Sequence, residues 1–409
     1  MHPFKSSGLT LSGFPPHTFR PFSRFISLLL LFVAFLFVGF SGQAAAAPFA
    51  YVTLGGSGKI VILDVATNTV VREITSNVAS SSAVLSPSGR QLYLGSNAAH
   101  TVSVVDIASG TVTSTFRPMA ADGFPVALAV HPNGSRLYVS NQNGELLSVI
   151  DLSSNLPIAQ IPLIRPSGIA VSPTGNFAYV AQQRRDISPS TPRTVAVIDL
   201  QQNRMVSELI INASNTESIL FSPNGSRAYF IEGTHVVVVD TANHSILARW
   251  QLGGAEFGFS TMTSMAVSAD GLRLYVVADS SKRVHTVDTT TGNIVASFQY
   301  TNEPTSIVVD SAQQAAILLG NRTGLSTSVS LANGSVVKSF SIGEGPKASA
   351  LTMASFVPAQ QSIDNGGSSG GGGGCGYISG SGGPPDPMLP ALAALALLTI
   401  ALRRRARQR

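Results

Sequence analysis

The sequence His131-Pro132-Asn133-Gly134-Ser135-Arg136-Leu137-Tyr138-Val139 decides the fold, because the chain repeats this phrase about every 45 residues. In each copy a glycine stands four positions before a tyrosine, and short apolar runs lie on both sides. Repeats of this length that consist of short strands and tight turns are typical of a β-propeller, in which each repeat forms one four-stranded blade. The other clear copies are residues 86–94, 172–180, 222–230 and 268–276.

Each repeat contains four short runs rich in β-branched and aromatic residues, and these runs predict four strands. Residues 127–130 are an example of the inner strand, which runs into the turn phrase. Residues 137–140 are an example of the second strand, which carries the tyrosine. The third strand ends at an aspartate, as in 102–106, and the outer strand follows it, as in 294–298.

Two turns in each repeat explain which residues recur. The Pro-x-Gly step between the first and second strands predicts a tight turn, because glycine readily adopts a positive φ. Between the third and outer strands, each aspartate is followed four positions later by a residue that tolerates the left-handed region. The aspartate side chain can accept backbone N–H bonds inside that turn. The pairs are Asp64 and Asn68, Asp106 and Gly110, Asp151 and Asn155, Asp199 and Asn203, Asp240 and His244, Asp288 and Gly292, and finally Ser330 and Gly334.

The repeats count to seven. The first repeat lacks an inner strand because the body starts at Phe49, whereas a spare strand over 348–356 follows the last repeat. We therefore predict an all-β, seven-bladed β-propeller of four-stranded blades, closed by a C-terminal strand that completes the first blade and removes exposed sheet edges. The recurring aromatic position is assigned to structure rather than to cofactor binding; it is held by Tyr51, Tyr93, Tyr138, Tyr179, Tyr229 and Tyr275, with Ile317 in the seventh repeat.

Residues 1–46 have the layout of a secretory signal peptide. Three basic residues precede an apolar run over 26–40, and a run of small residues follows it. We predict cleavage after Ala46, because a cut after Ala47 would place Pro48 directly beyond the scissile bond. The alternative is an uncleaved membrane anchor. The mature chain then begins at Ala47, and we assign 48–358 to the propeller.

The C-terminal end divides into a linker and an apolar segment. Residues 359–387 are rich in Gly and Ser, which predicts a flexible spacer, and they contain Cys375, the only cysteine. Residues 388–409 combine a short apolar run with five arginines, which would stay on the cytoplasmic side of a membrane. As a helix, the apolar run is short for a full membrane span.

The formal net charge of +5 comes from the two ends, which carry three and five basic residues, so the body between them is slightly acidic. This balance argues against a nucleic-acid partner. A single cysteine excludes a framework of intramolecular disulfides, so the body must depend on its apolar core. We expect the body to be monomeric.

The repeats resemble those of the YVTN-type β-propeller family, which occurs in secreted and surface-layer proteins of bacteria and archaea. The signature is clearest in Leu137-Tyr138-Val139-Ser140-Asn141 and in Ala50-Tyr51-Val52-Thr53, and the resemblance covers residues 49–356. The seventh repeat departs from it, because residues 310–314 lack both the Pro and the Gly. The resemblance implies the fold and leaves the function open, since propellers host many activities.

The tail resembles bacterial C-terminal sorting signals, in which a Gly-rich stretch with one cysteine precedes an apolar helix and an arginine cluster. That resemblance implies removal of the helix by a membrane protease of the exosortase or rhomboid type and anchoring of the new end near Cys375. The tail lacks the Pro-Glu-Pro motif of some of these signals. The alternative is a short, permanent membrane anchor.

The connections between strands two and three and between blades vary in length, whereas the other turns are uniform, so we expect a binding face where the variable connections meet. The longest insertions are residues 182–192 and 253–263. The candidate residues of this face are Arg165, Arg184, Arg185, Glu256 and Phe257.

Three acids that precede inner strands could surround the mouth of the channel and hold a cation: Glu217, Glu303 and Glu344. Ordinary solvated loop charge is the alternative reading of the same residues. The body's histidines are scattered over different turns and strands, which predicts no histidine metal site. We find no cofactor motif and expect no cofactor.

Two functions follow from these observations. The first is an exported, envelope-anchored module without enzymatic activity, which binds a protein, a glycan or an envelope component through the variable face and contacts the membrane through its tail. The second is a lactonase-like hydrolase whose metal is held by the channel-mouth acids. The sequence does not identify the ligand.

Overall fold

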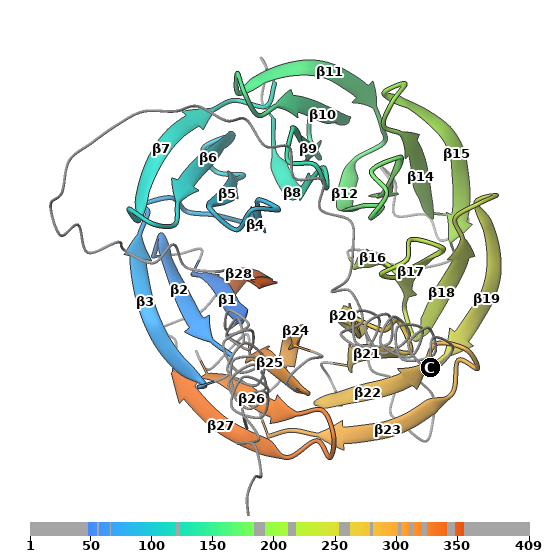
Figure 1. Ribbon diagram of the computed structural model, residues 1–409. Coiled ribbons are helices and arrows are strands. Elements are labelled where there is room, and N and C mark those ends of the chain that lie inside the picture. Colours follow the sequence, from blue (N-terminus) through green and yellow to red (C-terminus); the bar gives the residue numbers. More distant parts are fainter. Residues whose placement is uncertain are drawn as a thin grey trace, which may run out of the picture. The chain divides into compact units, whose positions relative to one another are not determined.

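The computed structural model describes residues 48–54, 57–65, 67–119, 123–183, 193–211, 218–252, 262–278, 281–301, 304–310, 314–320, 325–341 and 348–355. Of residues 48, 325, 340, 341 and 348–355 it describes the backbone only. All of these residues belong to the first of two compact units, Met1–Pro358. They form a ring of β-sheets (Figure 1).

Seven four-stranded antiparallel sheets make up the ring, as the repeats predict. Blade 1 contains, from the axis outward, β28 (Ala348–Ser355), β1 (Pro48–Leu54), β2 (Lys59–Asp64) and β3 (Thr69–Thr75). Blades 2 to 4 contain β4 (Ser82–Leu85), β5 (Gln91–Ser96), β6 (Thr101–Asp106) and β7 (Thr111–Phe116); β8 (Pro125–Val130), β9 (Arg136–Asn141), β10 (Leu146–Asp151) and β11 (Leu156–Pro162); and β12 (Pro166–Val171), β13 (Phe177–Gln182), β14 (Arg193–Asp199) and β15 (Arg204–Ile211).

The remaining three blades follow the same order. They contain β16 (Ile219–Phe221), β17 (Arg227–Glu232), β18 (His235–Asp240) and β19 (Ser245–Gln251); β20 (Met262–Val267), β21 (Arg273–Ala278), β22 (Arg283–Asp288) and β23 (Ile294–Gln299); and β24 (Pro304–Asp310), β25 (Ala315–Gly320), β26 (Leu325–Ser330) and β27 (Val336–Ser341).

The C-terminal strand closes the ring as predicted. β28 lies antiparallel to β1, and their register runs from Pro48 opposite Ser355 to Leu54 opposite Ala348. The first and last strands of the ring therefore share one sheet, and blade 1 is assembled from both ends of the repeat region (Figure 1).

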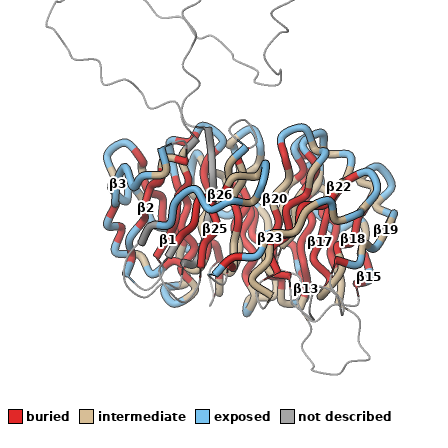
Figure 2. Tube along the Cα trace, turned by 90° about the horizontal axis from the view of Figure 1, so that it is seen from below, coloured by how far each residue is buried: buried red, intermediate tan, exposed pale blue. Residues whose placement is uncertain are grey.

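The second and third strands are buried on both faces, because each blade packs between two neighbours. β10 and β18, for example, each contain four consecutive buried residues between half-buried ends. Edge-on, the buried strands lie between two layers of exposed turns (Figure 2). The recurring aromatic position is at most 4% exposed in every blade, which confirms its structural role; it is held by Tyr51, Tyr93, Tyr138, Tyr179, Tyr229, Tyr275 and Ile317.

Both turn predictions are confirmed. The five glycines of the turn phrase have φ between 69° and 75°, and all seven residues at the predicted left-handed position of the other turn have φ between 49° and 75°. Aspartate carboxylates accept backbone N–H bonds inside the turn, as from Thr67 to Asp64 and from Ser109 to Asp106. In the divergent seventh repeat, Gln314 has a positive φ of 51°, one position after the place that glycine takes in the other copies of the phrase.

Every outer strand carries one extra residue, which the sequence did not predict. The pairing between the third and outer strands shifts at the same place in all seven blades, as between Val197 and Ile198 in blade 4. The unpaired residues are Val71, Thr113, Ile158, Val206, Leu247, Val295 and Val337. These positions form a belt of β-bulges around the rim, and its six apolar side chains are 40% to 56% exposed.

Candidate functional site

The two faces of the ring differ in the connections that they carry. One face carries the turns between first and second strands and between third and outer strands, and we call it the turn face. In blades 2 to 6 the first of these turns is five residues long, as in 86–90 and 222–226, and the second is four or five residues long in every blade. The repeated turn chemistry leaves this face nearly uniform.

The opposite face, which we call the variable face, carries connections of very different lengths. Between second and third strands they range from 233–234 in blade 5 to 183–192 in blade 4. Between blades they range from 163–165 to 252–261. Rigid blades that present unequal loops are a common arrangement for binding sites.

Arg165 is the one predicted binding-face residue that the structure describes. It lies between β11 and β12, where its φ is 41°. Its carbonyl accepts a bond of 3.1 Å from the N–H of Gln183, the first residue of the longest connection. Its Nε is buried and has no hydrogen-bond partner among the described residues. The bond from Gln183 holds Arg165 at the root of that connection, despite the strain of its positive φ.

Gln182, the last residue of β13, also fixes the start of the connection 183–192. This buried side chain accepts a bond from the Ile164 N–H at 2.7 Å and donates to Thr194 and Glu208 at 3.0 and 2.7 Å. Gln183 adds a bond from Gln142 of blade 3 at 2.9 Å. Both strand ends that lead into residues 184–192 are therefore held by side-chain hydrogen bonds.

The other predicted binding-face residues lie outside the described residues: Arg184, Arg185, Glu256 and Phe257. The same holds for the channel-mouth acids Glu217, Glu303 and Glu344. Within the described ranges, no group of three or more His, Cys, Asp or Glu side chains is placed to hold a metal ion. The structure therefore leaves both sets as predictions.

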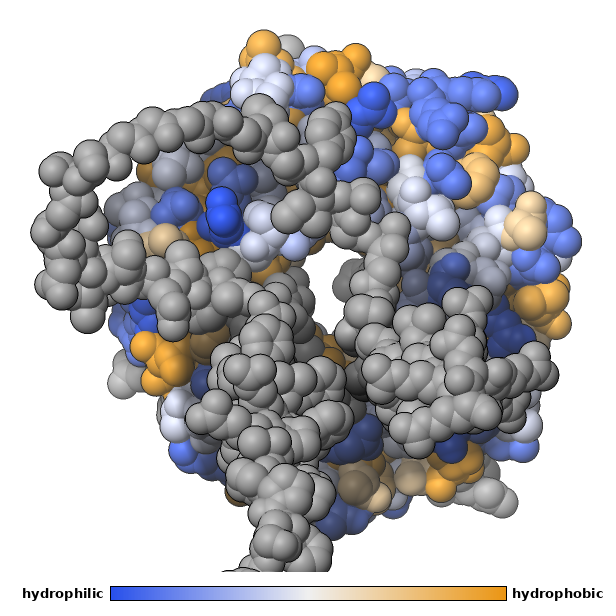
Figure 3. Space-filling model, in the orientation of Figure 1, coloured by the Kyte–Doolittle hydropathy of each residue, from blue (hydrophilic) through white to orange (hydrophobic). Residues whose placement is uncertain are grey.

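Figure 3 shows an opening between the described blades at the axis. Where their side chains are described, the inner strands around the axis carry apolar and small polar residues, as in Ala83, Ile169 and Ser306. Asp310 is the one charged residue on those strands, and it lies buried at the turn-face end of β24.

The processing residues and the segments around them also lie outside the described residues: Ala46, Ala47, Cys375 and the two apolar runs over 26–40 and 388–402. In the part of the chain that the structure describes, no helix is long and apolar enough to cross a membrane.

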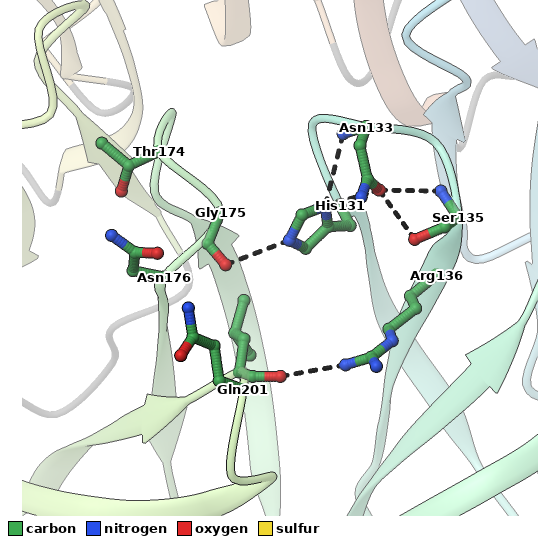
Figure 4. A pocket seen from close by; sticks show the side chains of 9 residues that line it. His131, Asn133, Ser135, Arg136, Thr174, Gly175, Asn176 and Gln201 are labelled. Carbon is green, nitrogen blue, oxygen red and sulfur yellow. Dashed lines mark hydrogen bonds between the residues drawn. The ribbon is translucent and has the colours of Figure 1, made fainter.

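A polar pocket of about 440 Å³ opens on the turn face between blades 3 and 4 (Figure 4). His131 and Asn133 line it from the turn before β9, Arg136 from the first position of β9, and Thr174 and Asn176 from the turn before β13. Two bonds cross between the blades: His131 Nε2 lies 3.0 Å from the Gly175 carbonyl, and Arg136 Nη1 donates to the Leu200 carbonyl at 3.0 Å. Gln201 and Ser135 complete the polar lining.

A second pocket of about 360 Å³ occupies the equivalent place between blades 5 and 6. Arg227 takes the place of Arg136 there and donates to the Thr289 carbonyl at 2.6 Å. Its other wall differs, because Asp270 stands where the first pocket has Thr174, and Leu272 stands where it has Asn176.

One buried histidine lies apart from these surfaces. His285 on β22 is 1% exposed and faces Val276 and Ser297 on the neighbouring strands. Burial and, to a smaller extent, the positive charge of Arg283 lower its pKa from 6.5 to about 4. This imidazole is therefore neutral at physiological pH and belongs to the core of blade 6.

Comparisons with known proteins support the fold. No model of a known protein family matches the sequence, and no curated protein matches it. Two of the similar solved structures serve as examples. Kuenenia stuttgartiensis hydrazine synthase has 19% identity and a TM-score of 0.58, and the match covers 68% of this chain and 94% of that chain. A functionally unknown protein from Desulfotomaculum acetoxidans DSM 771 has 16% identity and a TM-score of 0.62, and the match covers 75% of this chain and 98% of that chain.

At these identities the likeness extends to the fold alone. The chain is a β-propeller, while its resemblance to the YVTN-type family and to sorting signals stays a prediction from the sequence.

Proposed function

We propose that this propeller is an exported module, held at the cell envelope by its C-terminal segment, which binds a protein, a glycan or an envelope component through its variable face. The observation that supports the binding role is the contrast between the two faces. Turns of four or five residues repeat on one face, whereas the connections between second and third strands on the other range from two residues at 233–234 to ten at 183–192.

The anchoring at Arg165 and Gln182 supports the same proposal. A binding loop loses less conformational entropy on contact when its ends are already fixed. The bonds to Gln183 and within β13 and β14 provide such fixed ends at the longest connection. The insertion that follows carries two arginines, Arg184 and Arg185, which suit a polar or acidic partner surface.

Export and anchoring are proposed from the sequence of the two ends. The measurement that tests them is the intact mass of the protein isolated from the native envelope. A mass that starts at Ala47 and ends near Cys375 supports a sorted surface protein, and a mass that extends to Arg409 supports a permanent anchor. Recovery of the full chain from the cytosolic fraction would contradict export.

An exchange of connections tests the binding role in the full-length protein. In one variant, residues 183–192 are replaced by the four residues 97–100 from the equivalent place in blade 2. In the control, the turn 222–226 on the opposite face is replaced by 86–90. Cross-linking on intact cells should give adducts with the wild type and the control, and lose them with the first variant. Equal adducts from all three proteins would contradict binding through this connection.

A further inference from the structure

We propose that the pocket between blades 3 and 4 is a second, separate binding site, which takes a small carboxylate-bearing ligand the size of one sugar acid. The site lies on the turn face, away from the variable connections, so it is independent of the function proposed above. Its volume of about 440 Å³ falls within the range of small-molecule sites.

The charge of the lining favours an anion. Arg136 contributes a permanent positive charge, and no Asp or Glu lines the pocket. The bond to Leu200 occupies one of the five N–H groups of this guanidinium, whose planar fork matches a carboxylate. The Gly175 carbonyl, which also reaches the pocket, lies 3.0 Å from His131 Nε2, and this contact occupies one of its two lone pairs.

The remaining lining suits hydroxyl groups beside that carboxylate. The side-chain amides of Asn176 and Gln201 reach the pocket from blade 4, and each amide offers both donors and an acceptor (Figure 4). On the other wall, Asn133 Oδ1 accepts bonds from the Ser135 N–H and hydroxyl at 2.9 and 2.7 Å, which fixes the rim before any ligand arrives.

The buried tyrosine of blade 3 lies close to the charged group of the pocket. The Tyr138 ring is 6.4 Å from that of His131, and the Arg136 guanidinium acts on the Tyr138 hydroxyl by charge and hydrogen bonding, which opposes the rise in its pKa that burial causes. The equivalent hydroxyls of Tyr93 and Tyr179 bond instead to Gln91 and to His244, both at 2.9 Å.

The pocket between blades 5 and 6 shows which features are specific. It keeps the arginine and the bond from it to a carbonyl of the next blade, so that contact belongs to the repeat. It replaces His131 by Ser222 and adds the carboxylate of Asp270. The second pocket thus carries a carboxylate beside its arginine, which makes it less favourable for an anion than the first pocket and an internal control.

The test uses the full-length protein with ¹³C-labelled histidine, because the His131 ring reports on the pocket directly. D-glucuronate, propionate and glucose are titrated at constant pH. We expect saturable shifts of the His131 signal with both carboxylates, and none with glucose. An affinity for glucuronate at least tenfold higher than for propionate identifies a sugar acid as the ligand, whereas equal affinities identify a simple organic acid.

Three variants complete the test. Thr174→Asp copies the wall of the second pocket, where Asp270 Oδ1 accepts a bond of 2.9 Å from the Leu272 N–H, so the turn tolerates it. We expect this variant and Arg136→Gln to weaken binding at least tenfold. Arg227→Gln removes the equivalent contact in the second pocket and should leave binding unchanged. Absence of a saturable shift, equal shifts with glucose, or undiminished binding by Thr174→Asp would overturn the proposal.

Discussion

The glycine that ends the turn between the third and outer strands meets two requirements at once. Gly292 has a φ of 75°, which an L-residue adopts only with strain. A side chain at this position would also overlap the ring of Trp250, which reaches over from the outer strand of the preceding blade. The residue therefore serves both the turn and the contact between blades 5 and 6.

Gly292→Ala should lower the free energy of unfolding by more than backbone strain alone explains. Gly134→Ala is the matched control, because Gly134 has the same φ of 75° but its added Cβ would lie 3.8 Å from its nearest neighbour, Pro87. We expect the control to cost about 1–2 kcal/mol and Gly292→Ala to cost more, since the Trp250 ring must move. Urea unfolding measures both, and equal losses would show that the overlap relaxes freely.

His285 should make the stability of the ring depend on pH. Its pKa is about 4 in the folded protein and takes the ordinary value of 6.5 in the unfolded chain, so the unfolded chain binds more protons between these limits. The contribution of neutral His285 is thus complete above pH 6.5 and is lost as the pH falls toward 4. The loss amounts to about 3 kcal/mol.

His285→Val removes this titration and keeps a residue that blades 1 and 5 already carry there, at Val61 and Val237. Chemical denaturation between pH 7 and pH 4.5 should show a smaller loss of stability for the variant than for the wild type. Parallel pH profiles for the two proteins would mean that His285 is protonated as easily in the folded ring as in the unfolded chain.

At the scale of single elements, the bulges of the outer strands solve the problem of free edges. An outer strand presents unpaired N–H and C=O groups, and a regular edge invites pairing with another chain. One extra residue in each outer strand bends and twists that edge. The apolar side chain at the bulge is left at the rim, where Figure 3 shows apolar groups in several blades.

Because the bulge residue points to solvent, its side chain should matter little for stability. Val206 is 40% exposed, whereas Leu209 on the same strand is 7% exposed and packs in the core between blades 4 and 5. We expect Val206→Lys to change the free energy of unfolding by no more than about 0.5 kcal/mol, and Leu209→Lys to cost about 3 kcal/mol or more. Thermal or urea unfolding of the two variants distinguishes them, and a comparable loss in both would place Val206 in the core.

The strands and turns were predictable because their signals are local. Runs of β-branched residues, the glycine four positions before a tyrosine, and the aspartate of each turn all act within a few residues. The bulges were missed because the extra residue, such as Val206, is apolar like its neighbours, and only the pairing of two strands reveals it. All seven blades thus share a shift in strand register that the repeated sequence does not reveal.

Candidate sites were harder to predict, because they depend on contacts between blades. His131 stands where other repeats have serine, and it reads as a simple turn substitution until its 3.0 Å contact with Gly175 is seen. Arg136 likewise reads as a surface residue until it meets Leu200, 64 positions along the chain. The one sign of this pocket in the sequence was that position 131 holds a histidine where the other turn phrases hold a serine. The variable face, by contrast, was predicted from connection lengths alone.

At the scale of the whole molecule, blade 1 depends on the pairing of β28 with β1. A full-length gene with a stop codon after residue 347 would yield a ring without its closing strand. We expect this protein to unfold at a lower temperature and to self-associate through the uncovered edge of β1, because that edge offers unpaired backbone groups. A chain that ends at residue 358 retains β28 and is the control.

Light scattering after size exclusion, together with thermal unfolding, measures both properties. The shorter chain should elute as a mixture of larger species, and the control should match the full-length ring. If the two truncated chains were equally stable and equally monomeric, closure by β28 would contribute nothing measurable.

The shared blade also determines how the ring responds to force. Ser355, where the chain leaves β28, lies opposite Pro48, where it enters β1. If the tail tethers the protein to the envelope, tension on the tail acts on the ring at Ser355. The hydrogen bonds between β28 and β1 then bear the load one after another, starting at the Ser355 end, rather than all at once. The molecule would therefore yield first at the seam beside its own tether, while the six blades that are each built from one continuous stretch of chain remain intact.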